Sequence, residues 1–283
     1  MKKIHVLETV INTVNMEACV YAKGFENEIR SKGITVISEN DHEESRYHVS
    51  KPDLIVAFGG DGTILRAAHL AIAFDVPVIG INFGHLGFLA ETAPEDPAEL
   101  ADMILKKQGE TETRMILEAV VNDSDPYYAI NDVVVSRGGY ARLISLNVSV
   151  NTEFAGHMLA DGLVIATPTG STGYSVSAGG PVVSPDVDCM TITPVCPHSL
   201  QQRPQVVNGN SQIDIHLGND PLQAAVVQLD GQNVAVLKAN GKVCVRKSEK
   251  KLQLLRLYHI NYFTLVRTKL CEWGMNPEEE KKK

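Results

Sequence analysis

Short apolar runs alternate with helical patterns over the first hundred residues. The apolar runs predict strands at Ile4–Leu7, Ile34–Ser38, Leu54–Phe58 and Val76–Ile81. Between and after them, apolar residues at helical spacing predict helices from about Asn15 to Ser31, after Gly62, and over Pro97–Lys107. A strand that is apolar throughout, such as Leu54–Phe58, is typical of a sheet covered on both faces. The alternation predicts a mostly parallel sheet with right-handed crossovers.

The pattern changes near Gly109. Alternating apolar runs separated by turn signals predict a strand-rich second domain over 109–258, built as a sandwich or as paired sheets. Turn positions are predicted at Asn208-Gly209, Gly218-Asn219 and Asn240-Gly241. Helical spacing returns over 259–273, and residues 275–283 form a charged tail that we expect to be flexible. The first domain is predicted to span 1–108.

Composition narrows the function classes. The chain has 283 residues, with 26 Lys+Arg against 34 Asp+Glu and a formal charge of −8, which disfavours a nucleic-acid binder with a broad basic face. A bound polyanion must therefore be held by local donors or a metal. The five cysteines form no CxxC pair and indicate reduced thiols. No run approaches the roughly 18 apolar residues of a membrane span, so we expect a soluble, cytoplasmic protein.

The segment Gly59–Thr63 lies between a predicted apolar strand and a predicted helix. Glycines let backbone N–H groups approach a phosphate, and a helix N-terminus favours negative charge. Asp61 would be repelled by a phosphate unless it accepts a proton from an attacking hydroxyl or binds Mg²⁺. The alternative is an ordinary Gly-Asp-Gly turn, which the strand–turn–helix context makes less favoured.

A second dense segment runs from Asp161 to Gly180. Between Thr167 and Ser177 it concentrates Ser, Thr and Gly, which suit phosphate and ribose oxygens, although a purely structural loop can be equally rich in them. The chain has no GxxxxGK[ST] loop, no GxGxxG fingerprint, and no HRD or DFG element of a protein kinase.

Other polar positions have two interpretations. Asn131-Asp132 could bind an adenine edge and a ribose diol, or could simply occupy a bulge. Asp161-Gly162 and Asp230-Gly231, taken alone, each predict a hairpin turn. His85 and His198 are interpreted as structural, and the Phe83/Phe88 pair as core rather than as a stacking platform.

Taken together, these segments resemble the NAD kinase family. The matching segments, in order, are FGGDGTILRAA (58–68), GINFGHLGFL (80–89), INDVVVSRG (130–138), DGLVIATPTGSTGYSVSAGGPVVSP (161–185), TPVCPHSLQQRP (193–204), DGQ (230–232) and FTLVRTKLCEWG (263–274). The long segment ending in SAGGPVVSP is highly specific, whereas GGDGT alone also occurs in lipid kinases and phosphofructokinases.

The resemblance implies an α/β fold with a Rossmann-like parallel-sheet N-terminal domain, a β-rich sandwich-like second domain, and a C-terminal segment, about 259–274, that packs back on the first. It implies phosphoryl transfer from ATP, or from polyphosphate in some members, to the 2′-hydroxyl of the adenosine ribose of NAD, with Mg²⁺. Family members are usually homodimers or homotetramers, and neither nucleic acid nor a membrane is an expected partner.

The same resemblance assigns site residues. It implies that Asp61 is the general base and that Gly62 and Arg66 lie near the phosphates. Asn131 and Asp132 would contact the adenosine, and Asp161 the nicotinamide riboside. The remaining predicted nucleotide-binding residues, of which the first two match positions supplied partly across a subunit interface, are Arg142, Gln232, Phe88, Thr169, Thr172, Gly173, Tyr174, Ser175, Val176 and Ser177.

The sequence departs from the family pattern at three places. Asn131-Asp132 stands where most members have Asn-Glu, Gly173 replaces the usual alanine, and the first fifty residues match only loosely. Two other functions remain open at this point: a related kinase of lipids or sugars, and a nucleotide sensor that binds without turnover. The absence of a polybasic cluster outside the tail disfavours the lipid kinase, and Asp61 disfavours the sensor.

Overall fold

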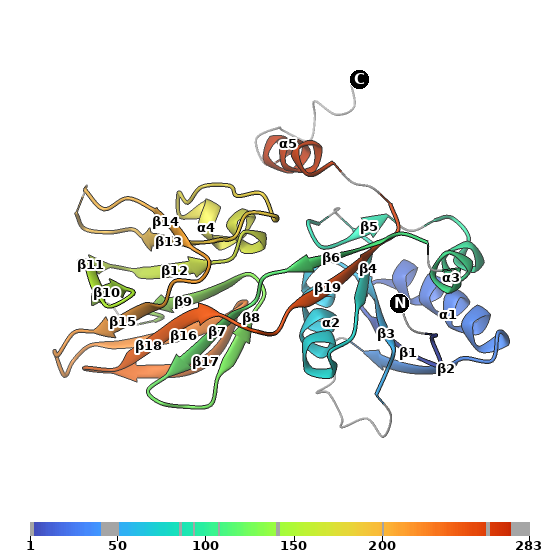
Figure 1. Ribbon diagram of the computed structural model, residues 1–283, viewed down its shortest axis with the longest axis horizontal. Helices are drawn as coiled ribbons and strands as arrows, with labels where there is room; N and C mark the ends of the chain where they lie inside the picture. The colour runs from blue at the N-terminus through green and yellow to red at the C-terminus, as the bar shows by residue number, and fades with distance from the viewer. Residues whose placement is uncertain are drawn as a thin grey trace. The chain divides into compact units, whose positions relative to one another are not determined.

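A computed structural model describes residues 3–40, 51–84, 87–92, 94–106, 108–139, 142–199, 201–258 and 261–272. The chain divides into two compact units: Met1–Ala67, Pro77–Glu112 and Leu254–Lys283 form the first, and Ala68–Val76 and Thr113–Gln253 form the second. Figure 1 labels the elements of both. His85 and the charged tail lie outside the described residues.

The first unit is built around a seven-stranded sheet of order β2-β1-β3-β4-β19-β6, with the short β5 paired to β4. Its strands are β1 (Val6–Ile11), β2 (Thr35–Asn40), β3 (Leu54–Gly59), β4 (Val78–Asn82), β5 (Glu91–Thr92), β6 (Glu110–Arg114) and β19 (Leu252–Arg256). The pairs formed by β1 with β2 and β3, and by β4 with β3, β5 and β19, are all parallel. The mostly parallel sheet predicted from the alternating pattern is therefore confirmed.

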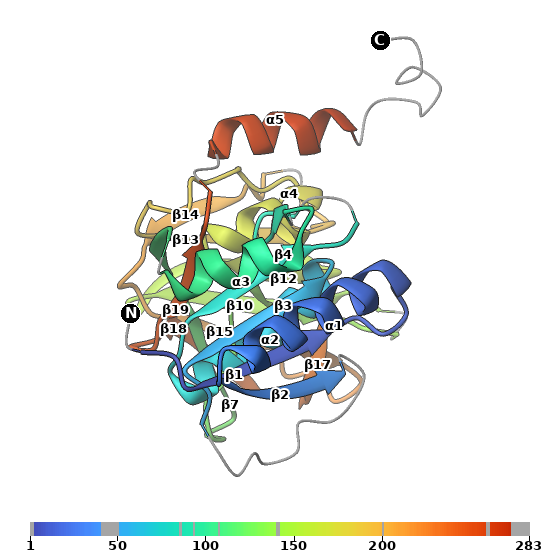
Figure 2. The same ribbon diagram turned by 90° about the vertical axis from the view of Figure 1, so that its right-hand side faces the viewer.

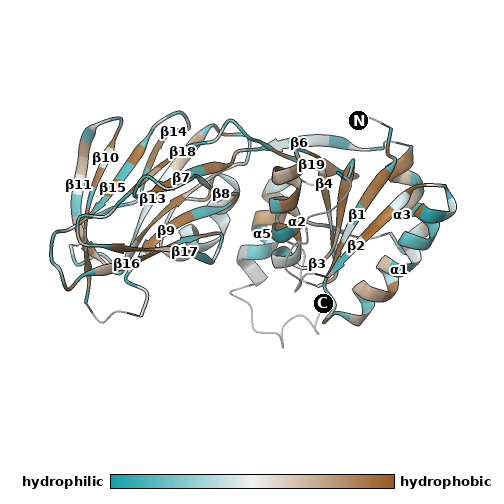
Figure 3. Cartoon of the chain, turned by 90° about the horizontal axis from the view of Figure 1, so that it is seen from below, coloured by the Kyte–Doolittle hydropathy of each residue, from teal (hydrophilic) through white to brown (hydrophobic). Residues whose placement is uncertain are grey.

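Helices cover both faces of this sheet, which is why its central strands are apolar throughout. Helices α1 (Met16–Ser31) and α3 (Pro97–Leu105) share one core with the side chains of Leu54, Val56 and Phe58, and Figure 2 shows the two helices together on one face. Helix α2 (Asp61–Phe74) covers the other face, where Ile64 fills the space left by the missing Cβ of Gly80. Figure 3 shows hydrophobic residues, in brown, on the strands of this sheet.

The second unit is a sandwich of two six-stranded sheets. One has the order β11-β10-β15-β18-β7-β8 and the other β14-β13-β12-β9-β16-β17, and side chains from both form one hydrophobic core. The strands are β7 (Leu117–Val121), β8 (Tyr127–Ala129), β9 (Asp132–Ser136), β10 (Ile144–Val150), β11 (Glu153–Ala160), β12 (Gly162–Ala166), β13 (Cys189–Val195), β14 (Gln205–Asn208), β15 (Ile213–Leu217), β16 (Ala224–Leu229), β17 (Gln232–Lys238) and β18 (Lys242–Lys247). The predicted sandwich is confirmed.

Two predictions of detail were wrong. The first strand runs over Val6–Ile11 rather than Ile4–Leu7, because Glu8 and Thr9, which read as a break in the apolar run, are fully buried within it. Asp161-Gly162 is no hairpin turn: β11 pairs with β10, whereas β12 pairs with β9 and β13 in the other sheet. The chain crosses between sheets there, and local turn chemistry does not distinguish a crossing from a hairpin.

Asp230-Gly231 does form the predicted tight turn. It joins the antiparallel strands β16 and β17, and both residues have positive φ, +48° and +81°. A two-residue hairpin of this kind favours Asp or Asn followed by Gly. The last helix, α5 (Tyr262–Glu272), follows β19 and lies within the predicted helical stretch 259–273.

Candidate active site

Asp61 begins helix α2 one residue after β3 ends at Gly59, at the carboxyl edge of the parallel sheet. Its side chain reaches solvent, and its carboxylate packs on the backbone of Gly87. A Cβ atom on Gly87 would lie 1.5 Å from Asp61 Oδ1, so only glycine allows this approach. Loop 87–91 thus borders one side of the carboxylate.

The surroundings of Asp61 suit a base. Burial raises the pKa of its carboxyl group, and the positive charge of Lys269 on α5 partly offsets that rise. A carboxylate with a raised pKa and access to solvent accepts a proton more readily than one on an open surface.

The other predicted residues of the first unit lie along α2 and loop 87–91. Gly62 is exposed one position after Asp61, and Arg66 is half-buried farther along the helix. Phe88 is half-buried, with its ring 6.2 Å from that of Tyr262 on α5. The structure therefore places Asp61, Gly62 and Arg66 on one helix, and Gly87, next to Phe88, against its first residue.

In the second unit, a single buried carboxylate organises the corner formed by Asn131 and Asp132. Asp230 accepts hydrogen bonds from the backbone N–H groups of Ile130, Asn131 and Asp132 at 2.8, 2.7 and 3.1 Å. His69 Nε2 lies 2.8 Å from Asp230 Oδ2. Asp230 and His69 were not predicted as site residues; the Asp-Gly pair signals a turn, which conceals the second role of its carboxylate.

Asp132 is buried beside this charge. Burial, with a smaller contribution from the charge of Asp230, raises the pKa of Asp132 from 3.8 to about 7. A Cβ atom on Gly173 would lie 3.9 Å from Asp132 Oδ2. The two departures from the family pattern, Asp132 and Gly173, are therefore neighbours in space, and together they leave more room at this spot than a glutamate and an alanine would.

The hydroxyl-rich segment follows β12 as a short 3-10 turn, Thr169–Thr172, and a single helical turn, α4 (Tyr174–Ser177). Gly173, Tyr174 and Ser177 are exposed, Thr172 and Val176 are half-buried, and Thr169 is buried. Ser175 is fully buried and its hydroxyl lies 3.0 Å from that of Thr193, so this side chain contributes to the interior rather than to an open surface.

Asp161 faces the same region. Burial raises the pKa of the Tyr174 phenol, and Cys196, Asp161 and Asp132 each add to that rise, which places these acidic groups around Tyr174. Asp161 also forms an ion pair at 2.5 Å with Arg137, a residue that sequence reasoning missed because it lies 24 positions away in the chain. Arg142 and Gln232 are exposed.

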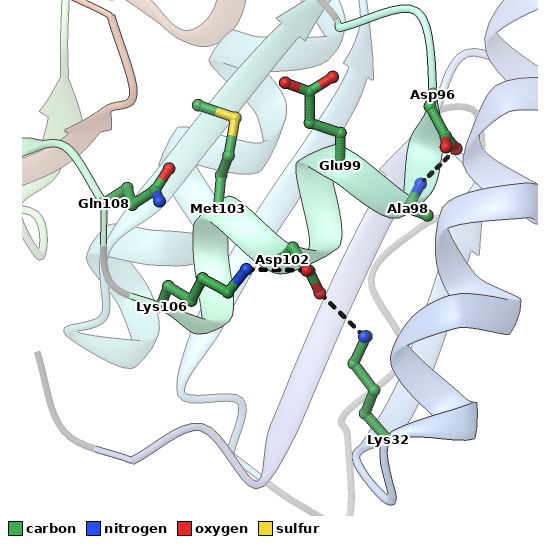
Figure 4. A pocket seen from close by; sticks show the side chains of 8 residues that line it. All are labelled: Lys32, Asp96, Ala98, Glu99, Asp102, Met103, Lys106 and Gln108. Atoms are coloured by element: carbon green, nitrogen blue, oxygen red, sulfur yellow. Dashed lines mark hydrogen bonds and ion pairs between the residues drawn. The ribbon is translucent and has the colours of Figure 1, made fainter.

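A depression of about 500 Å³ lies elsewhere, beside α3 (Figure 4), and it contains none of the predicted site residues. Asp102 at its centre is already paired with Lys32 and Lys106. Among the described residues, no group of three or more His, Cys, Asp or Glu side chains is arranged to hold a metal ion. Within that same part of the chain, no helix is both long enough and apolar enough to cross a bilayer.

Comparison with known proteins identifies the family. The family model described as the ATP-NAD kinase N-terminal domain matches residues 4–109, and that of the ATP-NAD kinase C-terminal domain matches residues 130–257. The chain belongs to the NAD kinase family. The NAD kinase of Clostridium botulinum (strain Loch Maree / Type A3) is 41% identical over 236 residues, which is 81% of each chain. The NAD kinase of Thermoanaerobacter sp. (strain X514) is 41% identical over 227 residues, 79% of this chain and 80% of that one.

Solved structures of NAD kinases share the fold. A yeast NADH kinase complexed with NADH superposes with a TM-score of 0.84 at 24% identity, over 98% of this chain and 89% of that one. An NAD kinase from Archaeoglobus fulgidus in complex with ATP gives a TM-score of 0.71 at 27% identity, over 89% of this chain and 93% of that one. The resemblance noted in the sequence, and the fold class it implied, are confirmed.

Proposed function

We propose that the protein phosphorylates NAD with ATP, with Asp61 as the general base. The 2′-oxygen of the adenosine ribose attacks the γ-phosphorus, its proton passes to the Asp61 carboxylate, and the bond to the ADP oxygen breaks so that ADP leaves. The observation that carries this proposal is a carboxylate of raised pKa and open access at the carboxyl edge of the parallel sheet.

The second unit supplies the proposed NAD-binding residues. Asn131 and Asp132, held by Asp230, are proposed to bind the adenosine part, and Asp161 to face the nicotinamide riboside. Arg142 and Gln232 are exposed and therefore available to act across a subunit interface in a homodimer or homotetramer. We place the enzyme in the cytoplasm.

The residues around Asp61 fit a Mg²⁺ ion that is held mainly by the substrate. Asp61 offers one carboxylate, and no three-ligand cluster exists among the described residues, which suits an ion bound mainly by substrate phosphates. Bound there, Mg²⁺ would neutralise charge on the phosphates. ATP is the proposed donor, and polyphosphate is the alternative.

The decisive test is Asp61→Asn. We expect NADP formation from NAD, ATP and Mg²⁺ to fall at least about a hundredfold while the fold and NAD affinity persist, because a positioned base contributes about 10²- to 10⁴-fold. The matched control is Asp75→Asn, an exposed position just past the other end of α2. Turnover of Asp61→Asn within a few-fold of the wild type would refute the general-base assignment. Tight NAD binding without product in the wild type would favour the sensor.

A further inference from the structure

Arg256, the last residue of β19, forms hydrogen bonds to loop 87–91, which borders Asp61. Its guanidinium Nη2 donates to the carbonyl oxygen of Phe88 at 2.9 Å, and Nη1 lies 3.5 Å from that of Ala90. Its Nε donates to Glu112 Oε2 at 3.1 Å, which fixes the orientation of the planar group. The Arg256 side chain is only 11% exposed. One side chain near the C-terminus thus holds two carbonyls of a loop about 170 residues earlier in the chain.

Glu91, at the end of loop 87–91, binds in turn to the segment that follows Arg256. Its carboxylate accepts the backbone N–H of Leu257 at 2.8 Å and is only 1% exposed. Burial raises its pKa, while hydrogen bonds from Leu257 and Tyr258 and the charge of Arg256 oppose that rise. A buried carboxylate is costly unless it is hydrogen-bonded, and the bonds from Leu257 and Tyr258 offset part of that cost. Loop 87–91 and segment 256–258 are therefore tied together in both directions.

Two groups that act on the Asp61 carboxylate, Gly87 and Lys269, belong to segments next to this connection. Gly87, at one end of the loop, packs on the carboxylate itself. Lys269, whose charge acts on Asp61, lies on α5, the helix that directly follows segment 256–258. The Phe88 ring lies beside Tyr262 of that same helix.

We propose that Arg256 and Glu91 are positioning residues, which hold loop 87–91 against Asp61 and so orient its carboxylate for proton transfer. The inference rests on the proposed function of Asp61. It goes beyond that function because Arg256 and Glu91 bind backbone groups of loop 87–91 and of Leu257, and we propose that they act on Asp61 through that loop. A misplaced catalytic group of this kind costs turnover rather than substrate affinity.

Three substitutions test the proposal. Arg256→Lys leaves one compact ammonium in place of a fork, and Glu91→Leu removes the acceptor of the Leu257 N–H. For both we expect kcat to fall at least tenfold, with the KM for NAD within about twofold. Glu91→Gln keeps an acceptor oxygen and should retain kcat within about threefold. The matched control is Arg246→Lys, at an exposed pair with Glu118, and should match the wild type.

Two further readouts separate positioning from a loss of folding. The acidic limb of the kcat profile of Arg256→Lys should move to lower pH, because a loosened loop leaves Asp61 less buried. Hydrogen exchange of the amides of residues 87–91 should accelerate in the two disruptive variants and not in Arg246→Lys.

The outcomes are distinguishable. An active wild type with Arg256→Lys within twofold of its kcat would overturn the proposal, as would equal losses in kcat and NAD affinity. A folded wild type that makes no NADP would instead refute the proposed function. In that case unchanged amide exchange in Arg256→Lys would overturn the anchoring itself.

Discussion

Asp132 and Asp230 are neighbouring buried carboxylates with very different surroundings. Asp230 accepts three backbone N–H groups and lies beside His69, whereas burial next to that charge raises the pKa of Asp132 to about 7. Asp132 therefore gains or loses a proton near neutral pH, while it sits at the corner proposed to bind adenosine.

Asp132→Asn should change how stability depends on pH. The folded protein keeps the Asp132 proton between pH 3.8 and about 7, whereas the unfolded chain releases it, so this group lowers stability progressively as pH rises through that window. The neutral variant lacks this loss, so its relative stability should grow from near pH 4 and level off above pH 7, at up to about 4 kcal/mol. Urea titrations at several pH values measure it, with pH 4 as the internal control. A stability difference independent of pH would contradict the assignment.

At the scale of elements, the β16–β17 hairpin both reverses the chain and supplies the Asp230 carboxylate. Its Asp230 has a φ of +48°, and its side chain fixes the three residues that lead into β9. Asn tolerates positive φ as Asp does, so Asp230→Asn removes the carboxylate without straining the turn.

We expect Asp230→Asn to destabilise the protein by about 2–4 kcal/mol and to raise the KM for NAD more than it lowers kcat. The reason is that a carboxamide offers one acceptor oxygen, which leaves buried N–H groups unpaired. His69→Gln, which removes one partner, should have a smaller effect on both quantities. Thermal unfolding and steady-state kinetics measure these effects, and equal losses from the two variants would argue against Asp230 as the organising group.

Elements were predictable where a residue's local pattern and its burial agree. The apolar run Leu54–Phe58 and the turn Asp230-Gly231 were read from adjacent residues, because a covered strand and a tight hairpin each have local requirements. The first strand was placed wrongly because Glu8, a polar residue, is fully buried within it. The motif around Asp61 could be recognised from the sequence. The hydrogen bond from Arg256 to the Phe88 carbonyl could not, because no local sequence pattern links residues so far apart.

The chain leaves the first unit, forms the sandwich, and then returns to complete the sheet of the first unit. Strand β19, after the entire sandwich, pairs with β4 through Leu254 and Val78 and lies between β4 and β6 in the sheet order. Leu255 and Leu257 enter the core of the first unit. The first unit is therefore incomplete until residues beyond 253 are present, whereas the core of the sandwich consists of residues between Leu117 and Val245.

A chain that ends at Gln253 should therefore lose one unit and keep the other. Without β19 the first unit lacks an internal strand and two core leucines, and NADP formation should fall below a hundredth of the wild-type rate. Amides of β9, β12 and β13 should remain protected from hydrogen exchange, because their core is intact. The matched control deletes only residues 275–283 and should keep full turnover. Wild-type turnover in the longer truncation, or rapid exchange of the amides of all three strands, would show that the two units do not have separate cores.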